Sequence, residues 1–515
     1  MRKACNRIFK AFYTLRMKRV DRYMKYPYEA QENVLKQLLV SAKHTKWGKQ
    51  YQYKSIKSAQ QYAERVPIGS YEDFQPYISR MMHGERNVLW HGRVRWYSKS
   101  SGTTSGRSKY IPVSRENLEK CHLRGNWDAM TLLYDQRPDA RMFELRTLIM
   151  AGNWNYFEPF PKSKIGDVSA IMLDRMPNVG KPFFAPDFET ALMEDFEAKI
   201  ERTAQLSSRV EDIVSIAGVP TWVMVLFRRV LEITGKSNIL EVWPHFQFYI
   251  HGGVSFLPYQ EQFERLLPSD QVSYQEVYNA SEGYFGVQSD FKEKDMLLLL
   301  ANGVYYEFIP MDEWDKEQPK AIPLADVELE KTYAIVISTN AGLWRYTPGD
   351  TIIFTSKNPY KFKISGRTKQ YINTFGEEVI VENTDRALVQ TCEQTGAIVQ
   401  DYMAAPIYMS DGKGGHEWLV EFNRRPNNLE EFATTLDRNL QKINSDYEAK
   451  RYKDMALECL QLRAIPKGTF QAWLKSKGKS GSQVKVPRLA NDRELIEGVL
   501  NFMQQKRRTS RQGAI

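Results

Sequence analysis

The residues from Ser100 to Lys109 combine the features of a phosphate-binding loop. They read Ser-Ser-Gly-Thr-Thr-Ser-Gly-Arg-Ser-Lys, and apolar residues on both sides predict a strand–loop–strand unit. Glycine lets the backbone approach an anion closely, hydroxyls and backbone N–H groups donate hydrogen bonds, and Lys109 adds charge. The spacing is not that of a Walker A loop, which has four residues between its glycines and a lysine directly after the second. By itself, such a segment is equally typical of a flexible turn.

Two further segments carry residue types that suit a nucleotide. Tyr278 is followed by Ser281 and Glu282, which offer an aromatic face for a purine, a hydroxyl for phosphate and a carboxylate for Mg²⁺. Asp350 follows a Pro-Gly turn, where its carboxylate can accept hydrogen bonds from both ribose hydroxyls. Each residue taken singly has an ordinary explanation as well, since Tyr278 suits a core, Glu282 a surface and Asp350 a turn.

The remaining candidates are glycines and basic residues. Gly252 and Gly253 follow a predicted strand over residues 246–251, and Arg367 lies in the segment Ser-Gly-Arg-Thr-Lys. Lys485 lies in a basic stretch rich in Gly and Ser, for which a solvated surface loop is the ordinary interpretation. His245 and His251 are predicted to be structural histidines rather than metal ligands.

Taken together in this order, these segments resemble the motifs of the adenylate-forming ligases of the ANL superfamily. Within that superfamily the chain is similar to the Gretchen Hagen, or auxin-responsive, acyl acid–amido synthetases. The resemblance covers about residues 30 to 500. It rests on the Ser/Thr/Gly loop at 100–109, the aromatic-x-x-Ser-Glu motif at 278–282, the strand Tyr-Glu-Phe-Ile-Pro at 306–310, the aromatic-x-x-Gly-Asp motif at 346–350, the Gly-Arg hinge segment at 366–379 and the lysine motif at 483–488.

The resemblance implies two chemical steps. MgATP activates a small-molecule carboxylic acid as acyl-AMP, and an amino acid or another amine then displaces AMP. It implies catalytic roles for Lys485, Ser281 and Glu282, with Glu282 also holding Mg²⁺, and a C-terminal domain that closes and then rotates. The residues that it assigns to ATP are Ser100, Ser101, Gly102, Thr103, Thr104, Lys109, Gly252, Gly253, Tyr278, Asp350 and Arg367.

Two departures from the family pattern bear on which type of family member this chain is expected to be. Gln370 occupies a hinge position where the superfamily often has Asp, and residues 375–378 read Phe-Gly-Glu-Glu where plant members carry a lysine-containing stretch. We therefore expect a bacterial-type relative and do not carry over the substrates of plant members. Residues 219–227 suit the wall of an acyl pocket and ordinary core equally well, so the sequence does not identify the acid.

Strand-like segments that end at glycine-bearing loops alternate with helical segments, which predicts an α/β fold. Ligands in such folds gather beyond the strand ends. We expect a large N-terminal adenylate-forming domain of several sheets over residues 1–370 and a small mobile α+β domain over residues 371–515, with a disordered tail from 506. Residues 296–300 and 303–309 are predicted to form a hairpin around Ala301-Asn302.

The composition limits the classes of protein that fit. No uninterrupted apolar stretch is long enough to span a bilayer, and the four cysteines lie too far apart for a metal site or a disulfide framework. We expect a monomer in the cytoplasm without stable membrane insertion. Residues 1–25 mix apolar and basic residues, which predicts an amphipathic helix packed on the domain, with transient contact to a membrane surface as the alternative.

Three other functions stay open at this point. The acceptor of the acyl group can be the thiol of coenzyme A or of a carrier protein, because the ATP motifs do not distinguish acceptors. A non-catalytic nucleotide-binding protein is a second possibility, although the presence of Glu282, Asp350 and Lys485 argues against it. The net charge of +10 permits anionic ligands but does not by itself indicate nucleic-acid binding, which we do not expect.

Overall fold

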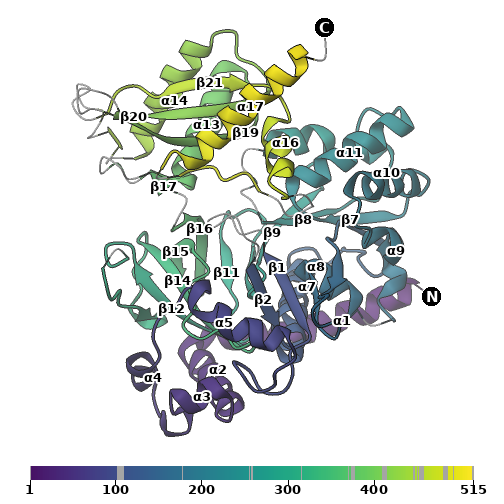
Figure 1. The fold of residues 1–515 in the computed structure, drawn as a ribbon. Coiled ribbons are helices and arrows are strands. Elements are labelled where there is room, and N and C mark those ends of the chain that lie inside the picture. Colours follow the sequence, from purple (N-terminus) through teal and green to yellow (C-terminus); the bar gives the residue numbers. More distant parts are fainter. Residues whose placement is uncertain are drawn as a thin grey trace.

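The computed structural model describes residues 2–100, 109–176, 178–253, 256, 259–314, 316–368, 371–372, 377, 379–408, 414–444, 447–448, 451, 457–479, 485–490 and 492–512. The elements up to residue 367 form a large lower body in Figure 1, and the elements that follow form a smaller body above it. Among the described residues, no helix combines the length and the apolar character that crossing a bilayer requires.

A sheet of twelve described strands forms the framework of the large body, in the order β13-β12-β14-β15-β16-β11-β10-β9-β8-β7-β3-β6. Neighbours from β9 to β6 are parallel, and neighbours from β13 to β9 are antiparallel. The strands are β3 Arg146–Ile149, β6 Phe184–Ala185, β7 Ile213–Ala217, β8 Phe248–Gly252, β9 Ser273–Asn279, β10 Tyr284–Val287, β11 Met296–Leu298, β12 Val304–Pro310, β13 Ile322–Pro323, β14 Thr332–Thr339, β15 Asp350–Lys357 and β16 Tyr360–Arg367.

Helices cover both faces of the parallel half of this sheet. Successive side chains of a strand point to opposite faces. Accordingly, Tyr249 of β8 packs with Phe227 of α11 (Pro220–Thr234), next to α10 (Phe196–Ser207). Its neighbour Phe248 packs with Tyr13 of α1 (Arg2–Lys25) and Met130 of α7 (Leu123–Gln136). Parallel strands with helices on both faces confirm the predicted α/β fold.

A second sheet holds the predicted strand–loop–strand unit. Its order is β2-β1-β5-β4, and Ser100 pairs with Lys109 across β1 and β2. The strands are β1 Trp96–Ser100, β2 Lys109–Val113, β4 Trp154–Tyr156 and β5 Lys164–Gly166. Around the two sheets lie α2 Pro27–Ala42, α3 Lys46–Gln50, α4 Ala59–Arg65, α5 Tyr71–Met82, α6 Arg115–Asn117, η2 Leu118–His122, α8 Val168–Asp174, α9 Phe188–Ala191 and α12 Gln260–Leu266, with the short turns η1 Tyr53–Ser55, η3 Lys181–Phe183, η4 Ile239–Glu241 and η6 Leu324–Asp326.

The smaller body is an α+β unit around the sheet β19-β20-β21. The expected division at residues 370 and 371 falls between β16 and β17. The last helix continues to Gln512, whereas the sequence predicts a disordered tail from residue 506. The elements are β17 Tyr371–Ile372, β18 Val379–Ile380, α13 Val381–Thr395, β19 Ile398–Tyr408, β20 Gly414–Arg424, α14 Leu429–Ile443, β21 Gln461–Ile465, α16 Thr469–Ser476 and α17 Glu494–Gln512.

The predicted hairpin around Ala301-Asn302 is wrong. Strand β11 lies between β10 and β16, whereas β12 pairs with β13 and β14. The backbone N–H of Leu299 donates to the carbonyl of Phe285 at 2.9 Å, and the side chain of Asn302 donates to the carbonyl of Tyr284. The segment therefore stays alongside β10 and leads into a different part of the sheet instead of turning back on β11.

Candidate active site

Most of the predicted residues that the structure describes line one large cavity, to which both bodies contribute. Its volume is about 2460 Å³, and its wall includes Gly253, Tyr278, Asp350, Arg367 and Lys485. Strands β8 and β9 end there side by side, and β15 begins where β16 ends. The cavity therefore lies beyond the ends of the strands, as predicted for an α/β fold.

The Asp350 carboxylate is held from two sides. The antiparallel register of β15 and β16 places Asp350 opposite Arg367, whose Nε lies 2.8 Å from Asp350 Oδ1. The Tyr278 hydroxyl donates to Asp350 Oδ2, and Arg367 Nη2 donates to the Pro348 carbonyl at 3.1 Å. Asp350 raises the pKa of Arg367, so the Arg367 guanidinium stays charged. The three predicted residues thus form one fixed unit at the cavity wall.

The motif over residues 278–282 is tied to the strand that leads into the Ser/Thr/Gly loop. The buried Ser98 hydroxyl of β1 donates to Ser281 Oγ at 2.9 Å. Glu282 is 7% exposed, and burial and then Asp350 raise the pKa of its carboxyl, an effect that Lys109 and Arg367 oppose. Lys109 also lies over the Tyr71 ring, 5.6 Å from its centroid. Acidic and basic side chains from three separate segments therefore line this end of the cavity, and the charge of Lys109 also acts on Glu282.

The positions of Gly252 and Gly253 both favour glycine, the first because of close backbone packing and the second because of its backbone conformation. A Cβ on Gly252 would lie 2.2 Å from the carbonyl oxygen of Val277 on the neighbouring strand. Gly253 has a φ of +83°, a conformation that glycine adopts at little cost. Lys485 Nζ lies 3.6 Å from the position that a Cβ on Gly253 would occupy. The turn after β8 is thus the place where Lys485, from the smaller body, meets the larger one.

The environment of Lys485 weakens its hold on a proton. Lys485 is an exposed residue of the cavity wall, and the neighbouring protein atoms take water away from its ammonium group. This desolvation, together with Arg367 and Arg488, lowers the pKa of Lys485 to about 8, although Asp350 acts in the opposite direction. Without a bound anion, Lys485 therefore loses its charge as the pH rises through about 8.

Sequence reasoning missed Arg488, which fixes the segment that carries Lys485. The Arg488 side chain is buried, and its Nη1 donates to both Asp385 oxygens, at 2.6 and 2.7 Å. Its guanidinium lies over the Tyr402 ring, 5.2 Å from the centroid, and a hydrogen bond links it to Tyr259 of the large body. The signal in the sequence is weak, because a basic residue three positions after Lys485 in a basic stretch looks like another solvated charge.

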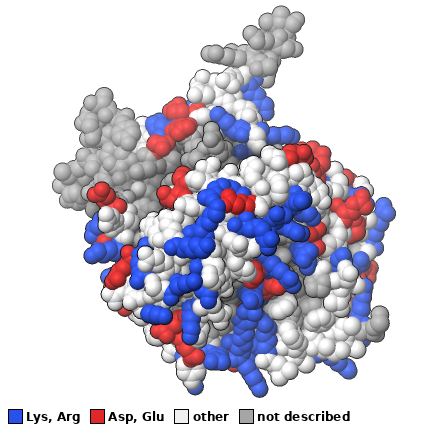
Figure 2. All heavy atoms as spheres, turned by 60° about the horizontal axis from the view of Figure 1, so that its bottom comes forward, with Lys and Arg blue, Asp and Glu red and all other residues white. Residues whose placement is uncertain are grey.

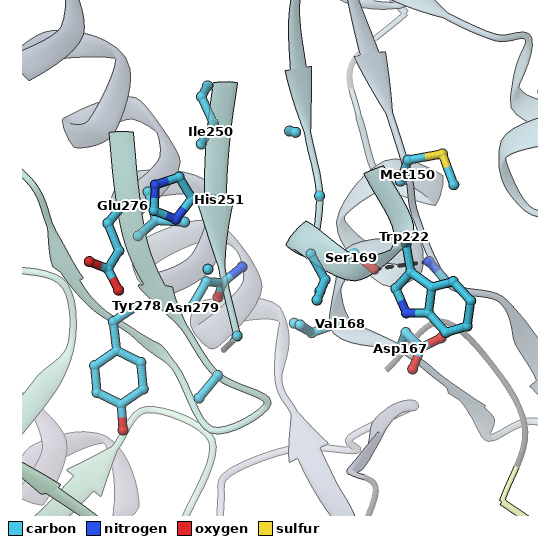
Figure 3. A pocket seen from close by; sticks show the side chains of 18 of the residues that line it. Met150, Asp167, Val168, Ser169, Trp222, Ile250, His251, Glu276, Tyr278 and Asn279 are labelled. Carbon is cyan, nitrogen blue, oxygen red and sulfur yellow. Dashed lines mark hydrogen bonds between the residues drawn. The ribbon is translucent and has the colours of Figure 1, made fainter. Parts of the chain in front are cut away.

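Sequence reasoning also missed Glu276, two residues before Tyr278 on β9. Both side chains line the cavity, and Glu276 lies beside His251 of the paired strand β8 (Figure 3). Burial raises the pKa of Glu276 to about 7 and lowers that of His251 to about 3. His251 is therefore neutral, which agrees with the structural role predicted for it. The two-residue period of a strand is the signal that places Glu276 on the face of Tyr278.

Figure 3 shows Met150, Asp167 and Trp222 on the opposite side of the pocket from Glu276 and Tyr278. Trp222 lies in the segment 219–227, which the sequence suggested equally as pocket wall or core. Val219, Trp222 and Val225 line the cavity, whereas Val223, Leu226 and Phe227 are buried in the core. The segment thus contributes to the cavity wall on one face and to the core on the other, while its role as the wall of an acyl pocket stays a prediction.

Part of the predicted phosphate loop lies outside the described residues. These residues are Ser101, Gly102, Thr103 and Thr104, and the Ser100 side chain is likewise not described. What the structure gives is the pair of strands that the loop joins, with Ser100 opposite Lys109. The loop therefore starts and ends beside Ser98, which contacts the 278–282 motif.

Glu282 is the residue that the sequence assigns to Mg²⁺. Among the described residues, no group of three or more His, Cys, Asp and Glu side chains could hold a metal ion by itself. Mg²⁺ bound with a nucleotide needs fewer protein ligands, because phosphates and water supply the others. Glu282 fits this requirement, since its carboxylate is buried near the negative charge of Asp350 and accepts a long hydrogen bond of 3.4 Å from Tyr346. A cation there would relieve the repulsion between the two carboxylates.

Solved structures share this architecture. The chain superimposes on the GH3.15 acyl acid amido synthetase with a TM-score of 0.78 at 17% sequence identity, covering 96% of each chain. It superimposes on an open conformation of 2-hydroxyisobutyryl-CoA ligase with a TM-score of 0.50 at 13% identity, covering 84% of this chain and 86% of that one. These likenesses confirm the predicted α/β fold, with a large N-terminal part and a smaller C-terminal one.

Curated proteins match over almost the whole length. Indole-3-acetic acid-amido synthetase GH3.3 of Arabidopsis thaliana is 23% identical over 91% of this chain and 90% of its own. Jasmonoyl–L-amino acid synthetase JAR4 of Nicotiana attenuata is 24% identical over 89% of this chain and 90% of its own. The GH3 family N-terminal domain matches residues 16–203 and 189–272, the central domain residues 297–367 and the C-terminal domain residues 382–494. The chain therefore belongs to the GH3 family.

Proposed function

We propose that this protein is an AMP-forming ligase that joins a small-molecule carboxylic acid to an amine, with an amino acid as the expected acceptor. The observation that carries the proposal is the position of Lys485. It comes from the smaller body and lies at the turn after β8, beside Asp350 and Arg367. The names of the related proteins, which are amido synthetases, support the same reaction.

In the first step a carboxylate oxygen of the acid attacks the α-phosphorus of ATP, and pyrophosphate leaves. Asp350 and Arg367 would hold the ribose, Tyr278 would stack on adenine, and Gly252 and Gly253 would let the purine lie against the backbone. The loop over residues 100–109 would hold the β- and γ-phosphates and Ser281 the α-phosphate. Glu282 would hold Mg²⁺, which supplies charge neutralisation to the phosphates when it is bound.

Lys485 would lie between the two anions that react. Its ammonium can donate to the acid carboxylate and to an α-phosphate oxygen at once, which offsets their repulsion. In the second step the amine nitrogen attacks the acyl carbon, the bond to the phosphate oxygen breaks, and AMP leaves with that oxygen. The amine loses a proton to solvent or a nearby base. The smaller body would rotate between the two steps.

The test is pyrophosphate and AMP release with MgATP, a panel of aryl and alkyl carboxylic acids, and each of the twenty amino acids. The expected result is AMP release that depends on both an acid and an amino acid. Mass spectrometry should identify the amide as the product. If AMP release depends on coenzyme A and on no amine, the proposed acceptor is wrong. Three finer expectations stay predictions: a bacterial-type member of the family, a monomer, and a cytoplasmic location.

Asp350→Asn is expected to weaken ATP binding by roughly 10- to 100-fold, because charged hydrogen bonds are worth about 1.5–3 kcal/mol each. The neutral amide would lose the ion pair with Arg367 and would keep only one of the two oxygens that can accept from ribose hydroxyls. Equilibrium titration with a fluorescent ATP analogue measures the effect. Arg367→Lys keeps the positive charge without the planar guanidinium and should give a smaller loss. ATP affinity unchanged in Asp350→Asn would contradict the assignment.

Removal of Mg²⁺ by EDTA is expected to abolish acyl-adenylate formation. Glu282→Gln should raise the Mg²⁺ concentration needed for half-maximal pyrophosphate release by at least roughly tenfold, since an uncharged amide binds a hard cation weakly. Glu276→Gln is the matched control, because it also removes a carboxyl from the cavity wall but at a residue to which no role in Mg²⁺ binding is assigned. Its Mg²⁺ requirement should equal that of the parent protein. Equal Mg²⁺ requirements in Glu282→Gln and in the parent protein would remove Glu282 as a metal ligand.

A further inference from the structure

The first helix, α1, exposes a row of large apolar side chains. Ile8 is 68% exposed, Phe12 45% and Leu15 66%, and their spacing places them on one face of the helix. Trp127 of the neighbouring helix α7 extends the row, since it is 40% exposed and its ring meets the Phe12 ring edge-on at 6.4 Å. We call Ile8, Phe12, Leu15 and Trp127 the α1 patch. Singly exposed apolar residues are normal, whereas a contiguous group indicates a contact site.

The opposite face of α1 is firmly attached to the protein. Tyr13, Val20 and Tyr23 are buried, and Arg16 Nη2 lies 2.5 Å from the buried Asp128 carboxylate of α7. Arg19 donates to the Ala301 carbonyl at 2.6 Å. Attachment on one side means that the α1 patch is held outward in a fixed position. Its exposure is therefore a property of the folded protein and not of a loose terminus.

The surroundings of the patch are strongly basic. Helix α1 contains one acidic residue, Asp21, and nine basic residues, which are Arg2, Lys3, Arg7, Lys10, Arg16, Lys18, Arg19, Arg22 and Lys25. Within the described part of the chain, Arg7 and Lys18, on the exposed side of the helix, take part in no ion pair. Figure 2 shows the underside of the molecule, where Lys and Arg side chains gather across the middle of the view.

The patch also adjoins the cavity. Ile8, Phe12 and Trp127 line the same cavity as Tyr278 and Ser281. The wall of this cavity also includes apolar side chains such as Met130 and Met172. A surface that binds at the α1 patch would therefore adjoin the cavity that holds the candidate site.

We propose that α1 is an in-plane anchor that docks this protein on an anionic lipid bilayer. Exposed Ile, Phe, Leu and Trp next to Lys and Arg is the composition of helices that lie in the membrane interface, where apolar side chains enter the acyl boundary and basic ones meet anionic headgroups. The complementary charge favours a lipid surface over a second copy of this chain, whose patch would carry the same positive charge. The docking does not depend on the proposed ligase reaction.

The test is flotation of the full-length protein with phosphatidylcholine vesicles that contain or lack phosphatidylserine. The parent protein should float with the anionic vesicles and detach at high salt. Ile8→Ser/Phe12→Ser/Leu15→Ser should lower the vesicle affinity at least tenfold, and Arg7→Glu/Lys18→Glu at least about 25-fold, because each basic residue near the surface adds about 1 kcal/mol. Val40→Ser/Leu329→Ser, which removes exposed apolar residues elsewhere, should leave binding unchanged.

Thermal unfolding of each variant shows whether it is folded before vesicles are added. Three results would overturn the proposal: no flotation of the folded parent protein with anionic vesicles, flotation that persists in the triple-serine variant, or flotation that is insensitive to Arg7→Glu/Lys18→Glu. Sedimentation velocity identifies the alternative occupant. A dimer of the parent protein that dissociates in the triple-serine variant would assign the α1 patch to contact between copies of this chain.

Discussion

Lys485→Ala is expected to lower the rate of acyl-adenylate formation by roughly 10²- to 10⁴-fold, the largest catalytic effect that we predict. The ammonium lies beside Gly253, Asp350 and Arg367, where the acid carboxylate and the α-phosphate would approach each other. Without it, two anions must meet with less positive charge between them. Single-turnover pyrophosphate release, with saturating MgATP and acid, measures this step directly.

Two comparisons make the result specific. Lys475→Ala removes another lysine of the cavity wall and should leave the rate within about twofold, if position rather than total charge matters. Preformed acyl-adenylate mixed with an amine should react at nearly the parental rate in Lys485→Ala. The smaller body would have rotated before this second step, which would take Lys485 away from the reacting atoms. Equal losses in both half-reactions would mean that Lys485 supports the fold of the site and not the first step.

The pKa of about 8 for Lys485 gives a pH dependence with a defined sign. As the pH rises through 8, Lys485 in the free protein loses its proton and its charge, so kcat/KM for adenylation should fall on the alkaline side. Bound phosphates favour the charged form, so kcat should fall at a higher pH than kcat/KM. Lys485→Arg should remove the alkaline fall, since guanidinium stays charged. A fall that persists unchanged in Lys485→Arg would assign it to another group.

Arg345→Met is expected to lower the free energy of unfolding by about 3–5 kcal/mol, the largest stability effect that we predict. Arg345 Nε and Nη2 donate to the two oxygens of Glu307, at 2.9 and 3.0 Å. Its Nη1 donates to the carbonyls of Ala63 and Val66, at 2.7 and 2.8 Å. Methionine fills a similar volume but leaves a buried carboxylate, a buried carbonyl and a partly buried carbonyl without their donor. Urea unfolding followed by tryptophan fluorescence measures the change.

The loss in Arg345→Met should depend on pH. Burial already raises the pKa of Glu307, an effect that Arg345 opposes, so the variant carboxyl has a higher pKa still. The folded variant then binds a proton more readily than the unfolded chain does. Its stability is greatest below the unfolded pKa and is lost as the pH rises through the folded pKa, so the difference from the parent narrows in acid. Glu307→Gln/Arg345→Met should recover part of the loss. A deficit below about 1 kcal/mol at neutral pH would show that the pair contributes little.

The residues of the candidate site could be found from the sequence because each motif is local. Tyr278, Ser281 and Glu282 occur within five residues, and Asp350 follows the turn that presents it. The chemical groups of such a motif, and their order, can be read directly from residues that are neighbours in the sequence. The α/β class was predictable for the same reason, since strand-like segments followed by glycine are visible along the chain.

The tertiary structure decided which strands pair with each other and which charged side chains contact each other. The hairpin at Ala301-Asn302 failed because the pairing of β11 and β12 is set by buried contacts with β10 and β14, and not by the residues between them. Arg345 and Arg488 are buried because they pair with Glu307 and Asp385, and these partners are far away in sequence.

The sequence by itself determined which groups are available for chemistry, the order in which they occur and the α/β class. The tertiary structure alone decided that Lys485 meets Gly253, that Arg367 and Tyr278 hold Asp350 from two sides, and that α1 keeps Ile8, Phe12 and Leu15 outward. The physical reason is that hydrogen bonds, ion pairs and apolar burial act over a few ångströms. A motif brings its own members within that range, whereas residues far apart in sequence reach it only when the whole chain packs.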